Sequence, residues 1–225
     1  PGVGPEHALW ADTGRVACWN AALLFDGQGE LIDRYRKIRL VPFGEYLPFD
    51  RVIPFLRRFS PLGISCLPGA ELTIFRLPGE KRTAFAALIC FEDAFADLSR
   101  GFVALGAALL INQTNDAWFD GSSGARQHMS HAVFRAVENR VALVRATNTG
   151  MTCLIDPVGR VDALGADPED RVDAGFAVYG APLRPDGTAL TVYGRYGNLL
   201  FSLPCGVLLL AVLLAAVRQA RAAAR

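Results

Sequence analysis

A cysteine stands where an apolar strand gives way to a helical segment. Cys90 ends the run AFAALIC and is followed at once by Phe91, Glu92 and Asp93. A nucleophile at such a turn is exposed above the sheet, where the backbone N–H of Phe91 can help to form an oxyanion hole and the helix start favours a thiolate. Cys90 is therefore a candidate nucleophile. Position alone favours the simpler interpretation, a small buried apolar residue at a strand end.

Lysine is rare in this chain, which makes a lysine in a structured segment informative. Of the 23 basic residues, only Lys37 and Lys81 are lysines. Lys37 lies at the end of the strand-like segment LIDRYRKIRL and opens the segment KIRLVPFGEY. Its simplest interpretation is a solvated charge at a strand edge.

Five motifs in a fixed order carry a resemblance to known enzymes. They are YRKIRLVPFGEYLPF with Lys37, ICFEDAF with Cys90, NDAWF at 115–119, QHMSHAVFRAVENR at 127–140 and RATNTG at 145–150. The first two resemble the nitrilase, or carbon–nitrogen hydrolase, superfamily, whose catalytic set is Glu, Lys and Cys, with a second Glu in a PxGE segment. All five together resemble the apolipoprotein N-acyltransferase family over roughly residues 15–217. Arg39 stands where many relatives have His.

The resemblance implies an α/β fold of the nitrilase type, an α-β-β-α sandwich that is incomplete at its N-terminus and followed by one C-terminal transmembrane helix. We expect residues 1–195 to form the partial catalytic domain, outside the cytoplasm. Residues 196–217 would cross the membrane, and 218–225 would form a basic cytoplasmic tail. The implied location is the bacterial inner membrane, multi-pass in the full-length protein, with the catalytic domain facing the periplasm.

The membrane helix also follows from the residues themselves. The segment from Leu199 to Val217 has no charged residue and is close to the roughly 20 residues that cross a bilayer core. Tyr193 and Tyr196 precede it, as interfacial aromatic residues do. Three arginines follow it, at positions 218, 221 and 225, so the positive-inside rule predicts a cytoplasmic C-terminus.

Hydrophobic periodicity predicts alternating strands and helices, typical of a layered α/β domain. A hairpin is expected over 16–25 and 31–40, around the turn at Asp26–Gly29. Further strands are expected over 72–77, 83–90, 107–112, 141–147 and 152–155, and helices over 93–105 and 125–139.

The implied reaction takes an acyl chain from a phospholipid donor, through a thioester on Cys90, to a diacylglyceryl-modified apolipoprotein acceptor. Lys37, a compact point charge, and the Phe91 N–H would face the oxyanion. Glu45 would hold and neutralise Lys37, or would instead pair with Arg39. Glu92 would orient the loop or cap the helix that follows; the two interpretations have equal weight.

The general-base glutamate of the resembled family is expected upstream of this sequence. Glu6 imitates its motif but lies in a Pro/Gly-rich turn too near Lys37, and Glu30 belongs to a hairpin turn. The chain as given therefore leaves two alternatives open. One is a membrane-tethered nitrilase-type amidase that acts on a small amide or nitrile, and the other is an inactive piece or interaction module without the base.

Composition and spacing argue against several other functions. A net charge of +1 argues against nucleic-acid binding. Neither GxGxxG nor a P-loop is present, so no nucleotide cofactor is predicted. The five cysteines are widely spaced, so neither a structural metal nor a disulfide scaffold is expected. His128 and His131 lie three apart on one predicted helix without an evident third ligand, and we expect them to be ordinary helix-face residues.

The segment between Lys37 and Cys90 is rich in apolar residues and arginine. Such a segment suits an arm that enters the lipid headgroup region, or ordinary packing beneath a long loop. Its apolar members are Leu47, Pro48, Phe49, Val52, Ile53, Phe55, Leu56, Phe59, Leu62 and Ile64, and its arginines are Arg51, Arg57 and Arg58. Trp118 and Phe119 line an acyl pocket or fill the core.

Overall fold

The computed structural model describes residues 18–49, 55, 66–77, 83–119, 122–164 and 175–223. Glu6 and most of the expected arm, residues 50–54 and 56–65, lie outside this described part. The strands are β1 (Ala21–Phe25), β2 (Leu31–Arg36), β3 (Phe75–Arg76), β4 (Ala84–Ile89), β5 (Leu109–Thr114), β6 (Ala142–Thr147), β7 (Cys153–Ile155) and β8 (Val161–Ala163). The helices are η2 (Cys90–Ala94), α2 (Ala96–Ala104), η3 (Asp116–Phe119), α3 (Gly124–Asn139), α4 (Val192–Tyr196) and α5 (Leu199–Ala223).

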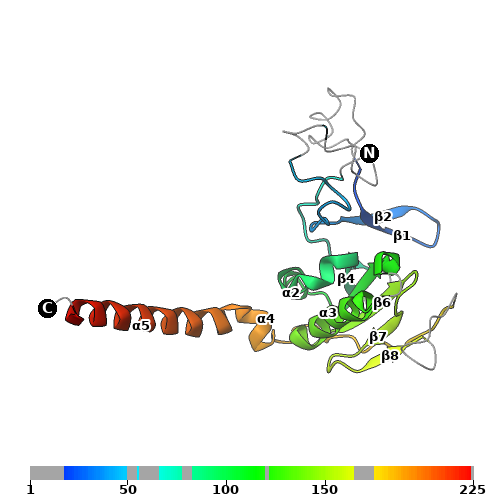
Figure 1. Cartoon of the computed structure of the whole chain (residues 1–225). Coiled ribbons are helices and arrows are strands. Elements are labelled where there is room, and N and C mark those ends of the chain that lie inside the picture. The colour runs from blue at the N-terminus through cyan, green and yellow to red at the C-terminus, as the bar shows by residue number, and fades with distance from the viewer. Residues whose placement is uncertain are drawn as a thin grey trace.

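Six strands form one mixed sheet in the order β3-β4-β5-β6-β7-β8 (Figure 1). β4, β5 and β6 run parallel, and the outer strands pair antiparallel. The parallel strands are joined by α2 and α3, which lie side by side over the sheet (Figure 1). The carboxyl ends of β4, β5 and β6 therefore meet at one edge of the sheet, where ligand-binding loops of open α/β sheets gather.

Apolar side chains between the helices and the sheet form the core. Phe102 of α2 and Leu110 and Leu143 of the sheet are fully buried there. Ala132 and Ala136, four residues apart and thus on one face of α3, are also fully buried, and their small size lets the helix approach the strands closely. The α/β class and the helix-on-sheet packing agree with the prediction.

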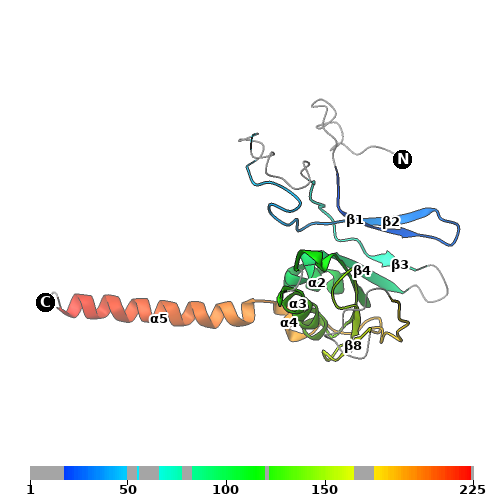
Figure 2. The same cartoon turned by 45° about the vertical axis from the view of Figure 1, so that its right-hand side comes forward.

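The β1–β2 hairpin lies beside the β3–β4 end of the sheet (Figure 2). Asp26 shapes its turn by accepting hydrogen bonds from the backbone N–H groups of Gln28 and Glu30, each at 2.9 Å. β2 ends at Arg36 rather than at residue 40, because the next backbone donors bind elsewhere: Lys37 N donates to Asn20 O, and the two N–H groups after it bind a side chain of η2. Glu30 is exposed in the turn, as expected.

One helix in the described part of the chain is long and apolar enough to cross a membrane. It spans Leu199–Ala222, with a mean hydropathy of 2.6 and no buried residue in its most apolar window. The helix starts at Leu199 rather than at residue 196, because Tyr196 belongs to α4 and Gly197 breaks the helix with φ 54°. Pro204 is accommodated within the first turns of α5. Figure 1 shows α5 projecting away from the domain.

Candidate active site

Cys90 sits at the predicted strand-to-helix turn. It is the first residue of η2, directly after β4, and its backbone has φ 54°, a left-handed conformation that is uncommon for residues other than glycine. Its carbonyl oxygen accepts a hydrogen bond from Nδ2 of the buried Asn112, at 3.1 Å. The side chain is partly exposed. A strained, supported backbone with an accessible thiol is an arrangement that functional sites favour over simple core packing.

Lys37 is not a solvated strand-edge charge. Its side chain is fully buried, and Nζ donates to Glu45 Oε1 at 2.9 Å and Oε2 at 2.8 Å. Glu45 also accepts from Asn20 Nδ2 at 2.7 Å and from Val41 N at 2.8 Å. Arg39 pairs instead with Asp97, so of the two interpretations of Glu45 the structure supports the Lys37 partner. A buried lysine with both carboxylate oxygens at hydrogen-bond distance keeps one position.

Glu92 connects the Lys37 segment to the Cys90 turn. Its fully buried carboxylate accepts, through Oε1, from Tyr35 Oη at 2.8 Å, Ile38 N at 2.8 Å and Arg39 N at 3.0 Å. Its Oε2 accepts from Ile89 N at 2.8 Å, which closes the start of η2. Oε1 thus contacts the Lys37 segment, as an orienting role requires, whereas Oε2 caps the start of η2 at Cys90 and not the helix expected from near Asp93. Burial raises the pKa of the Glu92 carboxyl, and the four donors oppose that rise.

Phe91 is partly exposed above this turn. Its ring meets the rings of Phe95, His128 and His131 at centroid distances of 5.7, 6.1 and 6.4 Å. Trp118 is largely exposed, whereas Phe119 packs on His128 at 5.5 Å. Of the two aromatic residues of the NDAWF motif, Trp118 thus lies at the surface and Phe119 packs against the domain.

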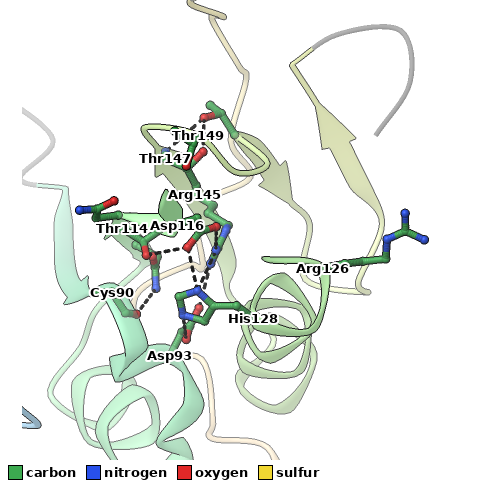
Figure 3. Close-up of polar contacts among 12 residues, drawn as sticks. Cys90, Asp93, Thr114, Asp116, Arg126, His128, Arg145, Thr147 and Thr149 are labelled. Atoms are coloured by element: carbon green, nitrogen blue, oxygen red, sulfur yellow. Dashed lines mark hydrogen bonds and ion pairs between the residues drawn. The ribbon is translucent and has the colours of Figure 1, made fainter. Parts of the chain in front are cut away.

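Behind the Cys90 turn lies a buried network of four charged side chains that the sequence interpretation did not foresee (Figure 3). Arg145 donates to Asp93 Oδ2 at 3.0 Å and to Asp116 Oδ2 at 2.6 Å. His128 lies between the same carboxylates, with Nδ1 2.9 Å from Asp116 Oδ1 and Nε2 3.0 Å from Asp93 Oδ1. Two carboxylates thus face an arginine and a histidine, an arrangement that balances charge when the histidine is protonated.

The protonation states within this network follow from its contacts. Burial lowers the pKa of His128, but Asp116 and Asp93 outweigh that effect and raise the pKa to about 9. Burial also raises the pKa of Asp116, but His128 and Arg145 outweigh it and hold the pKa below its usual range. At neutral pH His128 is therefore a cation between the two carboxylates.

Four of the five sequence motifs meet in this network, since ICFEDAF supplies Asp93. NDAWF supplies Asp116, QHMSH supplies His128, and RATNTG supplies Arg145. The last motif also supplies Asn148, whose Oδ1 accepts from Asp116 N at 3.0 Å, and Gly150, where a Cβ would lie 2.1 Å from Asp116 Oδ2. One signal could have revealed the network: Asp93 and Asp116 follow the neighbouring parallel strands β4 and β5, and Arg145 lies in the second half of β6, so all three are near one edge of the sheet.

The described side chains give no sign of a metal centre. Within the part of the chain that the structure describes, no three His, Cys, Asp or Glu side chains are grouped to hold a metal ion. The turn itself offers the Cys90 thiol and backbone N–H groups, and Glu92 ties it to the segment that carries the buried Lys37 ammonium. These are group types that acyl transfer uses.

Comparison with known proteins gives the family. The carbon–nitrogen hydrolase model matches residues 2–171. Apolipoprotein N-acyltransferase of Geobacter metallireducens is 41% identical over 191 residues, 85% of this chain and 35% of that protein. Apolipoprotein N-acyltransferase 1 of Treponema pallidum is 46% identical over 149 residues, 64% of this chain and 27% of that protein.

Among solved structures, Saccharomyces cerevisiae Nit3, a member of branch 10 of the nitrilase superfamily, has a TM-score of 0.49 and 22% identity, covering 65% of this chain and 49% of that chain. The chain spans about a third of the length of the curated relatives it matches. The family model covers most of the chain and includes Lys37, Glu45 and Cys90. The chain thus belongs to the carbon–nitrogen hydrolase family.

Proposed function

We propose that the chain is the catalytic part of a membrane-bound acyltransferase. It would move a fatty acyl chain from a phospholipid to the N-terminal amine of diacylglyceryl-modified apolipoproteins. Two kinds of support meet here: relatives at 36–46% identity are named apolipoprotein N-acyltransferase, and α5 is an uncharged helix of membrane length up to Val217. The observation that carries the proposal is the buried Lys37–Glu45 pair, linked through Glu92 to the Cys90 turn.

The first half of the proposed reaction forms a thioester. The Cys90 thiolate attacks the ester carbonyl of the phospholipid, and the carbonyl oxygen becomes an oxyanion. Lys37 and the Phe91 N–H stabilise that charge, and the carbon–oxygen ester bond breaks. The lysophospholipid leaves as its alkoxide takes up the proton that the general base, the glutamate expected upstream, removed from the Cys90 thiol. The acyl group then remains on Cys90 Sγ.

The second half transfers the acyl group to nitrogen. The neutral α-amine of the lipidated cysteine attacks the thioester carbonyl, and the same groups stabilise the second oxyanion. The carbon–sulfur bond breaks, the thiolate is regenerated, and the amine proton passes to a general base, the glutamate of the resembled family that is expected upstream. Splitting an ester-to-amide exchange into two steps lowers each barrier.

Glu45 acts on the reaction through Lys37. The carboxylate fixes Nζ with two hydrogen bonds and offsets the cost of burying an ammonium. Asn20 Nδ2 and Val41 N also donate hydrogen bonds to the Glu45 carboxylate, so the carboxylate itself is held in place. A preorganised charge needs no rearrangement when the oxyanion forms.

The acyl-enzyme is the intermediate that tests the proposal. The whole gene product carrying this sequence is reconstituted in vesicles that contain a phospholipid with a labelled acyl chain. We expect label on the tryptic peptide 83–100, which contains Cys90, as a hydroxylamine-sensitive thioester. Cys90→Ala should abolish the label, whereas Cys205→Ala, a change at an exposed α5 position, should leave it intact.

Two outcomes would count against the proposal. Label that persists in Cys90→Ala, or that maps to the peptide of Cys153, would remove Cys90 as the nucleophile. Turnover of a small soluble amide without any transfer from phospholipid would favour the amidase alternative. Adding a synthetic diacylglyceryl-cysteine peptide should discharge the labelled thioester and give a labelled N-acyl peptide.

A further inference from the structure

Two cysteines far apart in the sequence face each other beside the Lys37–Glu45 pair. Cys18 Sγ and Cys66 Sγ are 3.0 Å apart across a sequence separation of 48. Both are free thiols and both are partly exposed. The other cysteines occupy different places: Cys90 begins η2, Cys153 is buried in β7, and Cys205 lies in α5.

The backbones of the two cysteines are already paired. Cys18 and Cys66 form a parallel β-bridge, and Leu67 N donates to Cys18 O at 2.8 Å. Paired strands lie about 4.8 Å apart, which falls within the roughly 4.4–6.8 Å between Cα atoms that a disulfide spans. The two sulfurs are 3.0 Å apart, about 1 Å more than the roughly 2.05 Å of an S–S bond, so bond formation asks for a small movement of the side chains.

We propose that Cys18 and Cys66 are a site of reversible disulfide formation. The oxidant is a disulfide of the glutathione class or a protein disulfide. Cys18 thiolate attacks one sulfur of that disulfide, forms a mixed disulfide and releases one thiol. Cys66 thiolate then attacks Cys18 Sγ and releases the second thiol. Two thiols of this chain are oxidised, and one disulfide of the oxidant is reduced to two thiols.

The surroundings favour this order of attack. Burial and the contact with Cys18 raise the pKa of the Cys66 thiol to about 12, which keeps it protonated. Once Cys18 is part of the mixed disulfide, it no longer carries a thiol or thiolate beside Cys66, and one cause of the raised pKa of Cys66 is removed. Because the Cys66 thiol is held protonated, we assign the opening attack to Cys18 and the resolving step to Cys66.

The bond would join the two segments that enclose the Lys37–Glu45 pair. Asn20, two residues after Cys18, binds Glu45 through Nδ2 and accepts from Lys37 N through its carbonyl oxygen. Cys66 N donates to Glu45 O, and Gly69 N donates to Lys37 O at 2.7 Å. Gly69 has no room for a side chain, since a Cβ would lie 2.2 Å from Arg36 O. The disulfide would therefore connect the two segments that contact Lys37 and Glu45, one beginning at Cys18 and the other at Cys66.

The test uses the folded whole chain in detergent and does not depend on acyl transfer. The protein is equilibrated in mixtures of reduced and oxidised glutathione, quenched with acid, alkylated and digested with trypsin without reduction. Each cysteine falls in its own tryptic peptide: 16–34, 59–76, 83–100, 146–160 and 196–218. We expect a linked pair of 16–34 with 59–76, at least about tenfold above any other pairing, because folding raises the effective concentration of these two thiols.

Matched variants make the result decisive. In Cys18→Ser and in Cys66→Ser the linked pair should vanish, while circular dichroism shows that the fold is retained. Urea should lower the yield of the pair to the level of the other combinations. If both peptides stay alkylated where oxidised glutathione is in large excess, or if either peptide is linked to 83–100 instead, the proposed disulfide is wrong.

Discussion

The Glu92 carboxylate accepts a hydrogen bond from Ile38 N at 2.8 Å and thereby fastens the residue after Lys37 to the turn that begins at Cys90. The same carboxylate binds Ile89 N, the donor just before Cys90. One side chain thus spans the two segments that carry the proposed catalytic groups. The position of Lys37 relative to Cys90 depends on a buried acid that need not touch substrate.

Replacing Glu92 with Gln should weaken both the fold and the activity. In either orientation the amide NH₂ would face a backbone N–H, that of Ile38 or that of Ile89, which leaves a buried donor without an acceptor. We expect a loss of about 1–3 kcal/mol in the free energy of unfolding, measured by denaturant titration. Glu71→Gln, at an exposed position, should change it by less than about 0.5 kcal/mol. Equal stability of the two variants would contradict the bridging role.

Lys37→Arg should retain the charge and lose most of the acyl-enzyme formation. The planar guanidinium cannot place one donor where the compact ammonium sits between the oxygens of Glu45. A fall of about 100-fold in the labelling rate is expected, of the size seen when one oxyanion donor is lost. The control is Arg39→Lys, which alters the exposed pair with Asp97 and the contact with the Phe95 ring but keeps the charge. Near-normal labelling in Lys37→Arg would argue for a purely structural lysine.

The buried network predicts a pH dependence of stability with a definite sign. The folded state raises the His128 pKa from 6.5 to about 9, so it binds the proton more tightly than the unfolded chain does. The stabilisation is complete below about pH 6.5 and is lost as the pH rises through about 9. Wild type should lose about 2 kcal/mol more than His128→Gln between these values.

The neighbouring histidine supplies the control for that measurement. His131 lies on the same helix and contacts the Phe91 ring. His131→Gln should therefore retain the wild-type pH dependence in urea titrations at each pH. A flat wild-type profile, or an equal change in both variants, would mean that His128 is not held as a cation.

Gly150→Ala should disrupt the same network from the side of the RATNTG motif. The new Cβ would lie 2.1 Å from Asp116 Oδ2, an impossible contact that forces the carboxylate away from Arg145. We expect a loss of about 1–3 kcal/mol in stability. In Gly180→Ala nothing lies within 4 Å of the added methyl group, so its melting temperature should be close to that of wild type.

The proposed orientation in the membrane predicts the result of reporter fusions. The uncharged span ends at Val217 and arginines follow, so a tail in the cytoplasm is expected. A reporter active only in the cytoplasm should work when fused after Arg225, and one that requires export should be silent. The reverse pattern would place Cys90 in the cytoplasm, on the opposite side of the membrane from the proposed lipoprotein acceptors.

The sequence predicted best what depends on local pattern. The helix expected over 125–139 appears as α3 at Gly124–Asn139, and the strand-to-helix turn at Cys90 lies where the apolar run ends. Side-chain periodicity is enough for such elements, because each residue's environment repeats along its own helix or strand. The partnership of Lys37 and Glu45, eight residues apart, came from the family resemblance, and the sequence left Arg39 open as the alternative partner of Glu45.

Contacts between elements that lie far apart in the sequence could not be predicted from local pattern. The donors to Glu92 include residues more than 50 positions away, and the four charges around His128 come from four different elements. His128 had the same helical spacing as His131, and nothing in that spacing separates a buried cation from a surface residue. The pairing of Cys18 with Cys66 depends likewise on two segments that meet only in the fold.

The junction of α4 and α5 determines how the catalytic domain is held relative to the membrane. Only Gly197 and Asn198 separate the two helices, and Thr191, the N-cap of α4, donates its hydroxyl to the backbone oxygen of Glu138 at the end of α3. With α5 in the bilayer, the helix that carries His128 is thus connected to the membrane span by a short linker and a hydrogen bond, and not by a long flexible linker. The thiol would then stay at a nearly constant height above the lipid surface, and its encounters with lipid-anchored substrates would become a search in two dimensions.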